Sequence, residues 1–117
     1  MFLLFSTALD RDLTGELRLL ISRPGAEGEK TVRMRLVPGG AEAEAVDERG
    51  SRCGTGRVGT IVELALSREE LGLRPGERIS LTVRVLRDEV ELDRLPRYGE
   101  IAAEVPDRKF ELTNWRV

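Results

Sequence analysis

Residues 61–85 read IVELALSREELGLRPGERISLTVRV, which predicts a strand, one helical turn, a tight turn and a second strand in succession. Ser67 and Glu70 have the spacing of a capping box, in which a serine caps the first turn of a helix. Gly72 predicts the end of that turn, because glycine readily adopts the left-handed conformation found after helix ends. The Pro-Gly pair at 75–76 suits the centre of a type II turn. The residues of this stretch therefore indicate how the chain folds and do not by themselves indicate a function.

Along the whole chain, short segments of alternating apolar and polar residues recur at intervals of about ten residues, as in all-β proteins. The expected strands lie at 17–21, 32–37, 41–46, 79–85, around Leu92, at 101–105 and at 115–117. Charges alternate with alanines in 41–46, which predicts an edge strand. The glycines in 47–59 predict one long loop. We expect a two-sheet antiparallel β-sandwich, jelly-roll or related, of about eight strands with one short helical turn.

The composition fits one globular domain spanning residues 1–117, with 40% hydrophobic and 34% charged residues. The longest apolar runs, such as residues 1–5, fall far short of the roughly 20 residues that cross a bilayer. The N-terminus also lacks the basic region and the length of a secretion signal. We therefore expect a cytoplasmic domain with no membrane partner.

Charge is nearly balanced, with 19 basic and 21 acidic residues and a net charge of −2. The two signs are spread evenly along the chain. Proteins that bind nucleic acid usually gather lysine and arginine on one face. We therefore expect no nucleic-acid partner.

The chain has no histidine and one cysteine, Cys53. Histidine-based zinc sites, Ser-His-Asp triads and Cys-His pairs are therefore excluded within this chain. An intrachain disulfide is excluded as well. We expect Cys53 to be inert, because no histidine is present to activate it.

Gly54, Gly56 and Gly59 have the G-x-G-x-x-G spacing of a dinucleotide-binding loop. That loop requires a buried hydrophobic strand immediately before the first glycine, and residues 47–53, DERGSRC, do not provide one. A flexible glycine loop is the better interpretation, and we expect no cofactor.

Acidic residues offer two further candidate sites. Asp10 and Asp12 have the spacing that opens a calcium loop, but Ile21 stands where an EF-hand needs its glutamate. A looser calcium site at these aspartates is the alternative to a solvated turn, which is the commoner arrangement. Glutamates at 89 and 91, or at 100 and 104, are spaced as on a solvated strand face, so we expect no catalytic residue in this chain.

The chain has five aromatic residues, which are Phe2, Phe5, Tyr98, Phe110 and Trp115. Exposed tyrosine and tryptophan rings serve β-sandwiches as platforms on which sugar rings stack. Tyr98 lies in a turn signal and Trp115 lies near the end of the chain, so these two are the candidate carbohydrate-binding residues. For each of them, packing in the core is the role that we expect first, because large aromatic side chains anchor small cores.

The segments IVELALS, LGLRPGER, ISLTVRV, LDRLPRYGEIAAEVP and FELTNWRV follow one another in residues 58–117. Together they resemble the C-terminal β-sandwich domain of glycoside hydrolase family 57 enzymes, the α-amylase and glucanotransferase-like group. The matching positions are Glu63, Leu64, Leu71, Gly72, Leu73, Pro75, Gly76, Pro96, Gly99, Val105 and Pro106. Where an aromatic is expected before Pro96, this chain has Leu95, which removes one candidate sugar platform.

The resemblance implies a non-catalytic accessory domain from the C-terminal end of a larger glycoside hydrolase or glucanotransferase. Such a domain would bind α-glucan weakly or support the parent catalytic domain. The matching residues are turn, cap and core residues, so they indicate a fold more directly than a function. The alternative is a protein-interaction β-sandwich that docks through its loops or an edge strand and binds no sugar.

Overall fold

The computed structural model describes residues 2–6, 14–24, 28–37, 42–58, 61–105 and 112–114. These residues form an all-β fold with a single helical turn, as expected. The elements are β1 Phe2–Ser6, β2 Gly15–Ser22, β3 Glu29–Leu36, β4 Ala43–Val46, β5 Arg52–Val58, β6 Ile61–Leu66, α1 Arg68–Leu71, β7 Arg78–Arg87, β8 Val90–Leu95, β9 Ile101–Glu104 and β10 Leu112–Asn114.

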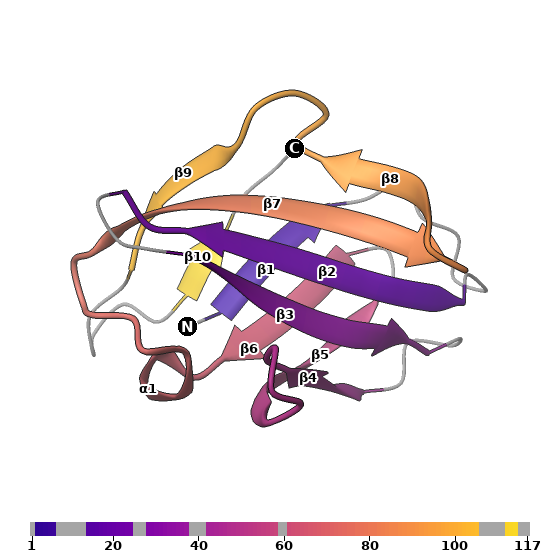
Figure 1. Ribbon diagram of the computed structural model, residues 1–117, viewed down its shortest axis with the longest axis horizontal. Helices are drawn as coiled ribbons and strands as arrows, with labels where there is room; N and C mark the ends of the chain where they lie inside the picture. Colours follow the sequence, from indigo (N-terminus) through magenta and orange to yellow (C-terminus); the bar gives the residue numbers. More distant parts are fainter. Residues whose placement is uncertain are drawn as a thin grey trace.

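The strands form one continuous sheet in the order β10-β1-β6-β5-β4-β3-β2-β7-β8, with β9 also paired to β7. The pairs are antiparallel except for β1 with β10. The sheet curls so that β3, β2, β7 and β8 lie in front of β5, β6, β1 and β10 (Figure 1). A division into two separate sheets is not observed, because β4 pairs with both β3 and β5 and joins the two halves. For the same reason, the expectation that 41–46 is an edge strand is wrong.

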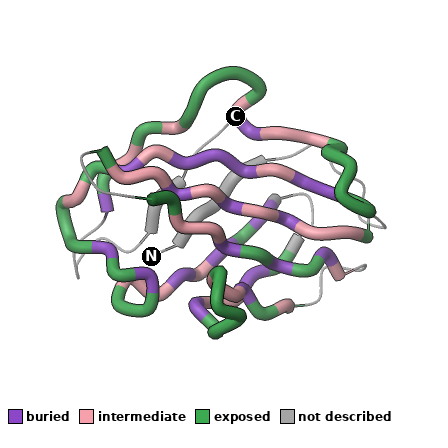
Figure 2. The backbone as a smooth tube through the Cα atoms, viewed as in Figure 1, coloured by how far each residue is buried: buried purple, intermediate pink, exposed green. Residues whose placement is uncertain are grey.

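The core lies inside the curl and receives side chains from both halves. Buried and more exposed residues alternate along β2 and β3, which gives one covered face and one open face (Figure 2). The fully buried side chains include Leu17, Leu19 and Ile21 of β2, Val32 and Met34 of β3, Val62 and Leu64 of β6, and Leu81 and Val85 of β7. Burial of each such side chain stabilises the fold by roughly 1.5–3 kcal/mol.

Within the segment 47–59 that was expected to be one long loop, residues 52–58 instead form strand β5, whose residues 54–58 pair with β6, and among its described residues only 47–51 form a turn. A Cβ atom at Gly54 would overlap the carbonyl oxygen of Ala65. A Cβ atom at Gly56 would lie 2.6 Å from the carbonyl oxygen of Glu63. Glycine is therefore required here because another backbone approaches closely. Gly54 and Gly56 do not form a phosphate-binding loop, and Gly59 lies outside the described residues.

The helical turn α1 is capped at both ends. The Ser67 hydroxyl accepts a hydrogen bond from the Glu70 amide at 3.3 Å, which confirms the predicted N-cap. The other half of the capping box is not formed, because the Ser67 amide donates to the Cys53 carbonyl at 2.8 Å. Gly72 ends the turn with φ +67°, as predicted. The turn is thus fixed by its own cap and by a bond to β5.

The predicted Pro-Gly turn at 75–76 is also present. Gly76 has φ +81°, and the Glu77 amide donates to the Arg74 carbonyl at 3.1 Å. The Gly76 amide in turn donates to the carbonyl of Val105 at 2.8 Å. The turn is therefore attached to the end of β9.

Candidate functional site

Strand β7 carries two partner strands on one edge. Strand β8 pairs with residues 83–87 of β7, and β9 pairs with residues 78–81 of the same strand. The chain between β8 and β9 must therefore leave the sheet. Residues 96–100 form the connecting loop, which arches outward above β7 (Figure 1).

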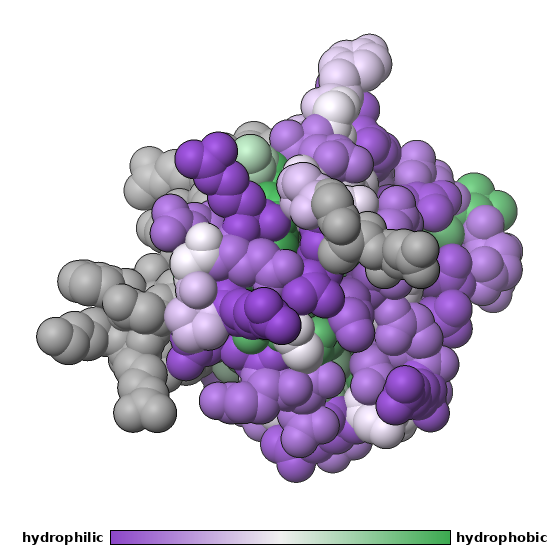
Figure 3. Space-filling view, turned by 60° about the vertical axis from the view of Figure 1, so that its left-hand side comes forward, coloured by the Kyte–Doolittle hydropathy of each residue, from purple (hydrophilic) through white to green (hydrophobic). Residues whose placement is uncertain are grey.

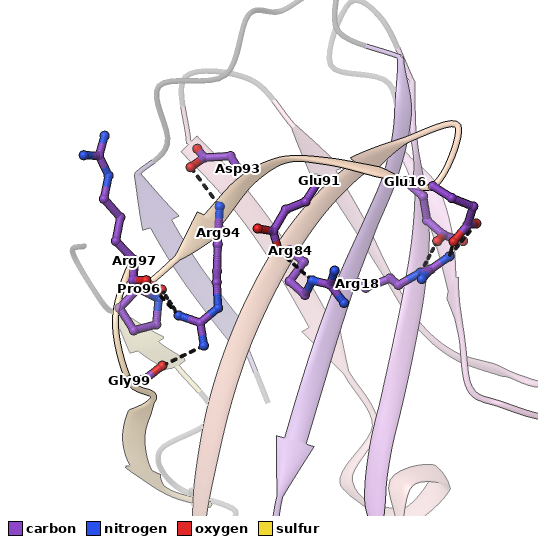
Figure 4. Close-up of polar contacts among 10 residues, drawn as sticks. Glu16, Arg18, Arg84, Glu91, Asp93, Arg94, Pro96, Arg97 and Gly99 are labelled. Carbon is purple, nitrogen blue, oxygen red and sulfur yellow. Dashed lines mark hydrogen bonds and ion pairs between the residues drawn. The ribbon is translucent and has the colours of Figure 1, made fainter.

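Arg94 at the end of β8 holds this loop in place. Its guanidinium donates to the carbonyl oxygens of Pro96 at 2.7 Å, Arg97 at 3.0 Å and Gly99 at 3.1 Å (Figure 4). The planar five-donor fork of arginine allows one side chain to bind several carbonyls at once. The loop backbone is consequently fixed on both sides of residue 98.

Tyr98 occupies the outer part of this loop, and its residue surface is 91% exposed. Tyr98 therefore lies exposed in its turn and does not take the core-packing role that the sequence favoured for it. Leu95, which directly precedes Pro96, is only 8% exposed and belongs to the core cluster. The position before Pro96 is thus an interior position, so the missing aromatic there does not remove a surface platform.

Beside the loop, the outer face of β2, β7 and β8 forms an open groove of about 420 Å³. Hydroxyls line its base, since Ser22 and Ser80 are direct partners on β2 and β7, and Thr82 follows on the same face. Carboxylates line it as well, namely Glu29, Glu91 and Glu100. A groove of this size can hold a small ligand, and its lining is dominated by hydrogen-bonding groups.

Two arginines also line the groove, and both have partners within the protein. Arg84 Nε donates to Glu91 Oε1 at 2.7 Å, and Arg94 binds the loop carbonyls (Figure 4). Among the described residues, the Glu29 carboxylate receives only a long hydrogen bond of 3.4 Å, from Ser22 Oγ. Within the described part of the chain, Glu100 has neither an ion pair nor a hydrogen bond from its side chain. Carboxylates at 29 and 100 are therefore the charged groups left available to a ligand.

The glutamates considered as an acid and base pair have separate partners. Glu89 lies in the two-residue turn between β7 and β8, with φ +64°, rather than on a strand. Its carboxylate accepts from Arg18 Nη2 at 2.9 and 3.1 Å. Glu91 is bound to Arg84. Each carboxylate is thus part of a surface ion pair on the sheet.

Cys53 lies in the core and is 1% exposed. Burial, together with the negative charge of Asp47, raises the pKa of its thiol to about 11. The thiol Sγ donates to the carbonyl of Ala45 at 3.6 Å. An enclosed thiol with a raised pKa is a poor nucleophile, so the inertness of Cys53 stays a prediction that its buried position supports.

The remaining candidates, Trp115, Asp10 and Asp12, lie outside the described residues. Within the described ranges, no group of three metal-binding side chains occurs, and no helix has the length and apolar character to span a membrane. Much of the surface seen in Figure 3 is hydrophilic, with small apolar areas. Sequence reasoning did not find the groove or Arg94, because the groove combines residues from strands far apart in the chain.

Comparison of the chain with protein-family models, curated proteins and solved structures found no match.

Proposed function

We propose that this chain is a non-catalytic accessory domain of a glycan-processing enzyme, which binds α-glucan weakly at the groove beside the Tyr98 loop. The observation that carries the proposal is the almost fully exposed ring of Tyr98 on a loop whose backbone is held by Arg94. Loops held by a rigid sheet are common positions for ligand-binding residues.

The chemistry of the groove agrees with a sugar ligand. A sugar ring has an apolar face of C–H groups that can stack on tyrosine, and a rim of hydroxyls that require hydrogen-bonding partners. Ser22, Ser80 and Thr82 provide hydroxyls, and Glu29 and Glu100 provide acceptors. A single stacked ring with a few polar partners gives an affinity near the millimolar range, about −4 kcal/mol.

Such weak binding has a use when the domain is tethered to a catalytic domain, because tethering raises the local concentration of the bound glycan. The resemblance to family 57 accessory domains supplies that context. The parent catalytic domain is then the second partner. We also propose that the two halves of the curled sheet, which share one core, correspond to the two layers of a jelly-roll-like sandwich.

Titration with maltooligosaccharides, followed by NMR chemical shifts, tests this proposal. We expect shifts in the loop at 96–100, a large loss of affinity in Tyr98→Ala, and retained affinity in Tyr98→Phe, which keeps the ring. Equal binding by Tyr98→Ala would overturn the site. Absence of shifts at high sugar concentration would overturn sugar binding.

A protein-interaction role without sugar binding is the second candidate, and one observation favours it. The exposed large hydrophobic side chains among the described residues are Val90, Leu92 and Tyr98, all on or next to β8. Strand β8 is also the last strand in the sheet order. However, Asp93 Oδ1 accepts from the Arg94 amide at 2.8 Å, and a backbone amide engaged in this way is less available to an added strand. Concentration-dependent sedimentation that is abolished by Val90→Ser with Leu92→Ser, without any sugar-induced shifts, would favour this role.

A further inference from the structure

The arrangement of charge in the groove carries an inference about which sugars it accepts. It rests on the proposed function, since it assumes that the groove holds a glycan. Three carboxylates and two arginines line the groove, but both arginines are already engaged by other groups of the protein. Arg84 is neutralised by Glu91 at 2.7 Å.

The other arginine, Arg94, is hydrogen-bonded to the backbone of the protein's own loop at 96–100. Arg94 donates through Nη1 to two carbonyls and through Nη2 to a third, all of them in the loop. Several of its N–H donors are therefore already used and are not available to an anionic ligand. A carboxylated or sulfated sugar would find few free donors here.

Glu29 and Glu100, which form no ion pair with another described residue, lie on opposite sides of the groove. Glu29 begins β3 and Glu100 immediately precedes β9, while β2 and β7 lie between these strands. Three strand spacings of about 4.8 Å place β3 and β9 about 14 Å apart. The hydroxyls of Ser22 and Ser80 lie between the two sides. The groove thus has hydroxyl acceptors and donors at its base and a negative group on either side.

We propose that the groove prefers amine-bearing sugars, such as glucosamine oligomers, to neutral sugars of the same length, and that it discriminates against uronic acids and sulfated sugars. The ammonium group of a glucosamine unit would pair with Glu29 or Glu100, while the neighbouring hydroxyls bind the serines. Because both glutamates are solvent-accessible, each pair adds only a modest attraction. We expect glucosamine tetramer to bind about three to ten times more tightly than its N-acetylated counterpart at low salt.

The test compares three tetramers by NMR titration. Glucosamine tetramer and N-acetylglucosamine tetramer differ in charge at every ring, and maltotetraose measures the proposed α-glucan binding independently. The preference should vanish in the double variant Glu29→Gln with Glu100→Gln, and it should shrink strongly at about 1 M salt, where charges are screened within about 3 Å. The double variant Glu44→Gln with Glu69→Gln is the matched control, because it makes the same charge change at exposed positions outside the groove.

The outcomes separate the two proposals. Equal binding of the charged and acetylated tetramers, alongside binding of maltotetraose, would overturn the charge preference and leave the proposed function standing. A preference that survives in the groove variant would also overturn it, because the carboxylates would then not be its source. A failure of all three tetramers to bind would overturn both proposals.

Discussion

The carboxylate of Glu77 receives two hydrogen bonds from the guanidinium of Arg23, at 2.7 and 3.1 Å, although the residues are 54 positions apart in the chain. Both side chains are 20% exposed, so this pair is better shielded from water than the ion pairs Arg52–Glu44 and Arg57–Glu42. The amide of Arg74 donates a further bond to Glu77 at 3.0 Å. The pair thereby joins the end of β2 to the turn at 75–76. The hydrogen bonds from Arg23 and then from Arg74 lower the pKa of Glu77.

Glu77→Gln should destabilise the fold by about 1 kcal/mol at neutral pH, because it removes a charge-assisted pair. A carboxyl group whose pKa is lowered by folding adds stability above its unfolded pKa of about 4.3, and this stability is lost as the pH falls through the folded pKa. The difference between wild type and Glu77→Gln should therefore shrink in the acid range. Urea unfolding at pH 7 and pH 3 measures it, and a difference of unchanged size at pH 3 would contradict the prediction.

Ser67→Ala should cost about 1 kcal/mol through loss of the N-cap of α1. The backbone bond from residue 67 to Cys53 is retained in this variant, so the change isolates the hydroxyl. Ser67→Gly is the comparison, since glycine caps helices nearly as well as serine and should cost only a few tenths of that amount. An unchanged urea midpoint in Ser67→Ala would show that the cap contributes nothing.

Gly76→Val should cost more than Ser67→Ala, roughly 1–3 kcal/mol, because a β-branched side chain resists the positive φ of the turn. Gly76→Asn is the matched variant, since asparagine tolerates this conformation far better. Thermal and urea unfolding should rank the proteins as wild type, then asparagine, then valine. Equal stability of the two variants would mean that the positive φ imposes no strain on valine.

Arg94→Gln should release the loop at 96–100 without unfolding the sheet, because the lost bonds all lead to loop carbonyls. Faster hydrogen exchange is expected at the amides of the loop, and sugar affinity should fall although Tyr98 is intact. Arg97→Gln serves as the control, since the Arg97 side chain is exposed and only its carbonyl takes part in the contact. Unchanged exchange in Arg94→Gln would show that the loop is held by other contacts.

Native protein should resist thiol alkylation at Cys53 at pH 8, because burial raises the pKa of this thiol to about 11 and encloses the sulfur. In increasing urea, the extent of iodoacetamide labelling should follow the fraction of unfolded protein measured by circular dichroism. Rapid labelling without denaturant would contradict the buried placement.

Sequence alone predicted those strands whose side chains alternate strictly, because period-two alternation directly reports a buried face. Residues 79–85 within β7 are the clearest case. Strand β5 was missed because Gly54 and Gly56 have no side chains that could alternate, and their role depends on the carbonyls of β6. The pairing of β4 on both sides was missed because local charges do not indicate which strands become neighbours.

In the candidate site, too, the features that neighbouring residues determine could be predicted, and those that depend on long-range strand pairing could not. The turn at Tyr98 could be predicted, because Gly99 and Pro96 mark it locally in the sequence, but the exposure of the ring was not, because large aromatics usually pack in small cores. The groove could not, because Ser22, Ser80 and Glu100 reach it from separate segments whose register is set by long-range pairing. The hydrogen bonds from Arg94 to the loop carbonyls could not be predicted either, because no local sequence pattern indicates that an arginine on a strand binds the backbone of the next loop.

The separate pairing of β8 and β9 with one edge of β7 has a consequence for how this protein can change over evolutionary time. Strands β8 and β9 each form their own hydrogen bonds with β7. The pairing of these strands therefore does not determine the length or composition of the loop between them. Insertions and replacements at this point can therefore accumulate while the core stays the same. What this loop recognises can thus change without any change in the strands on either side of it.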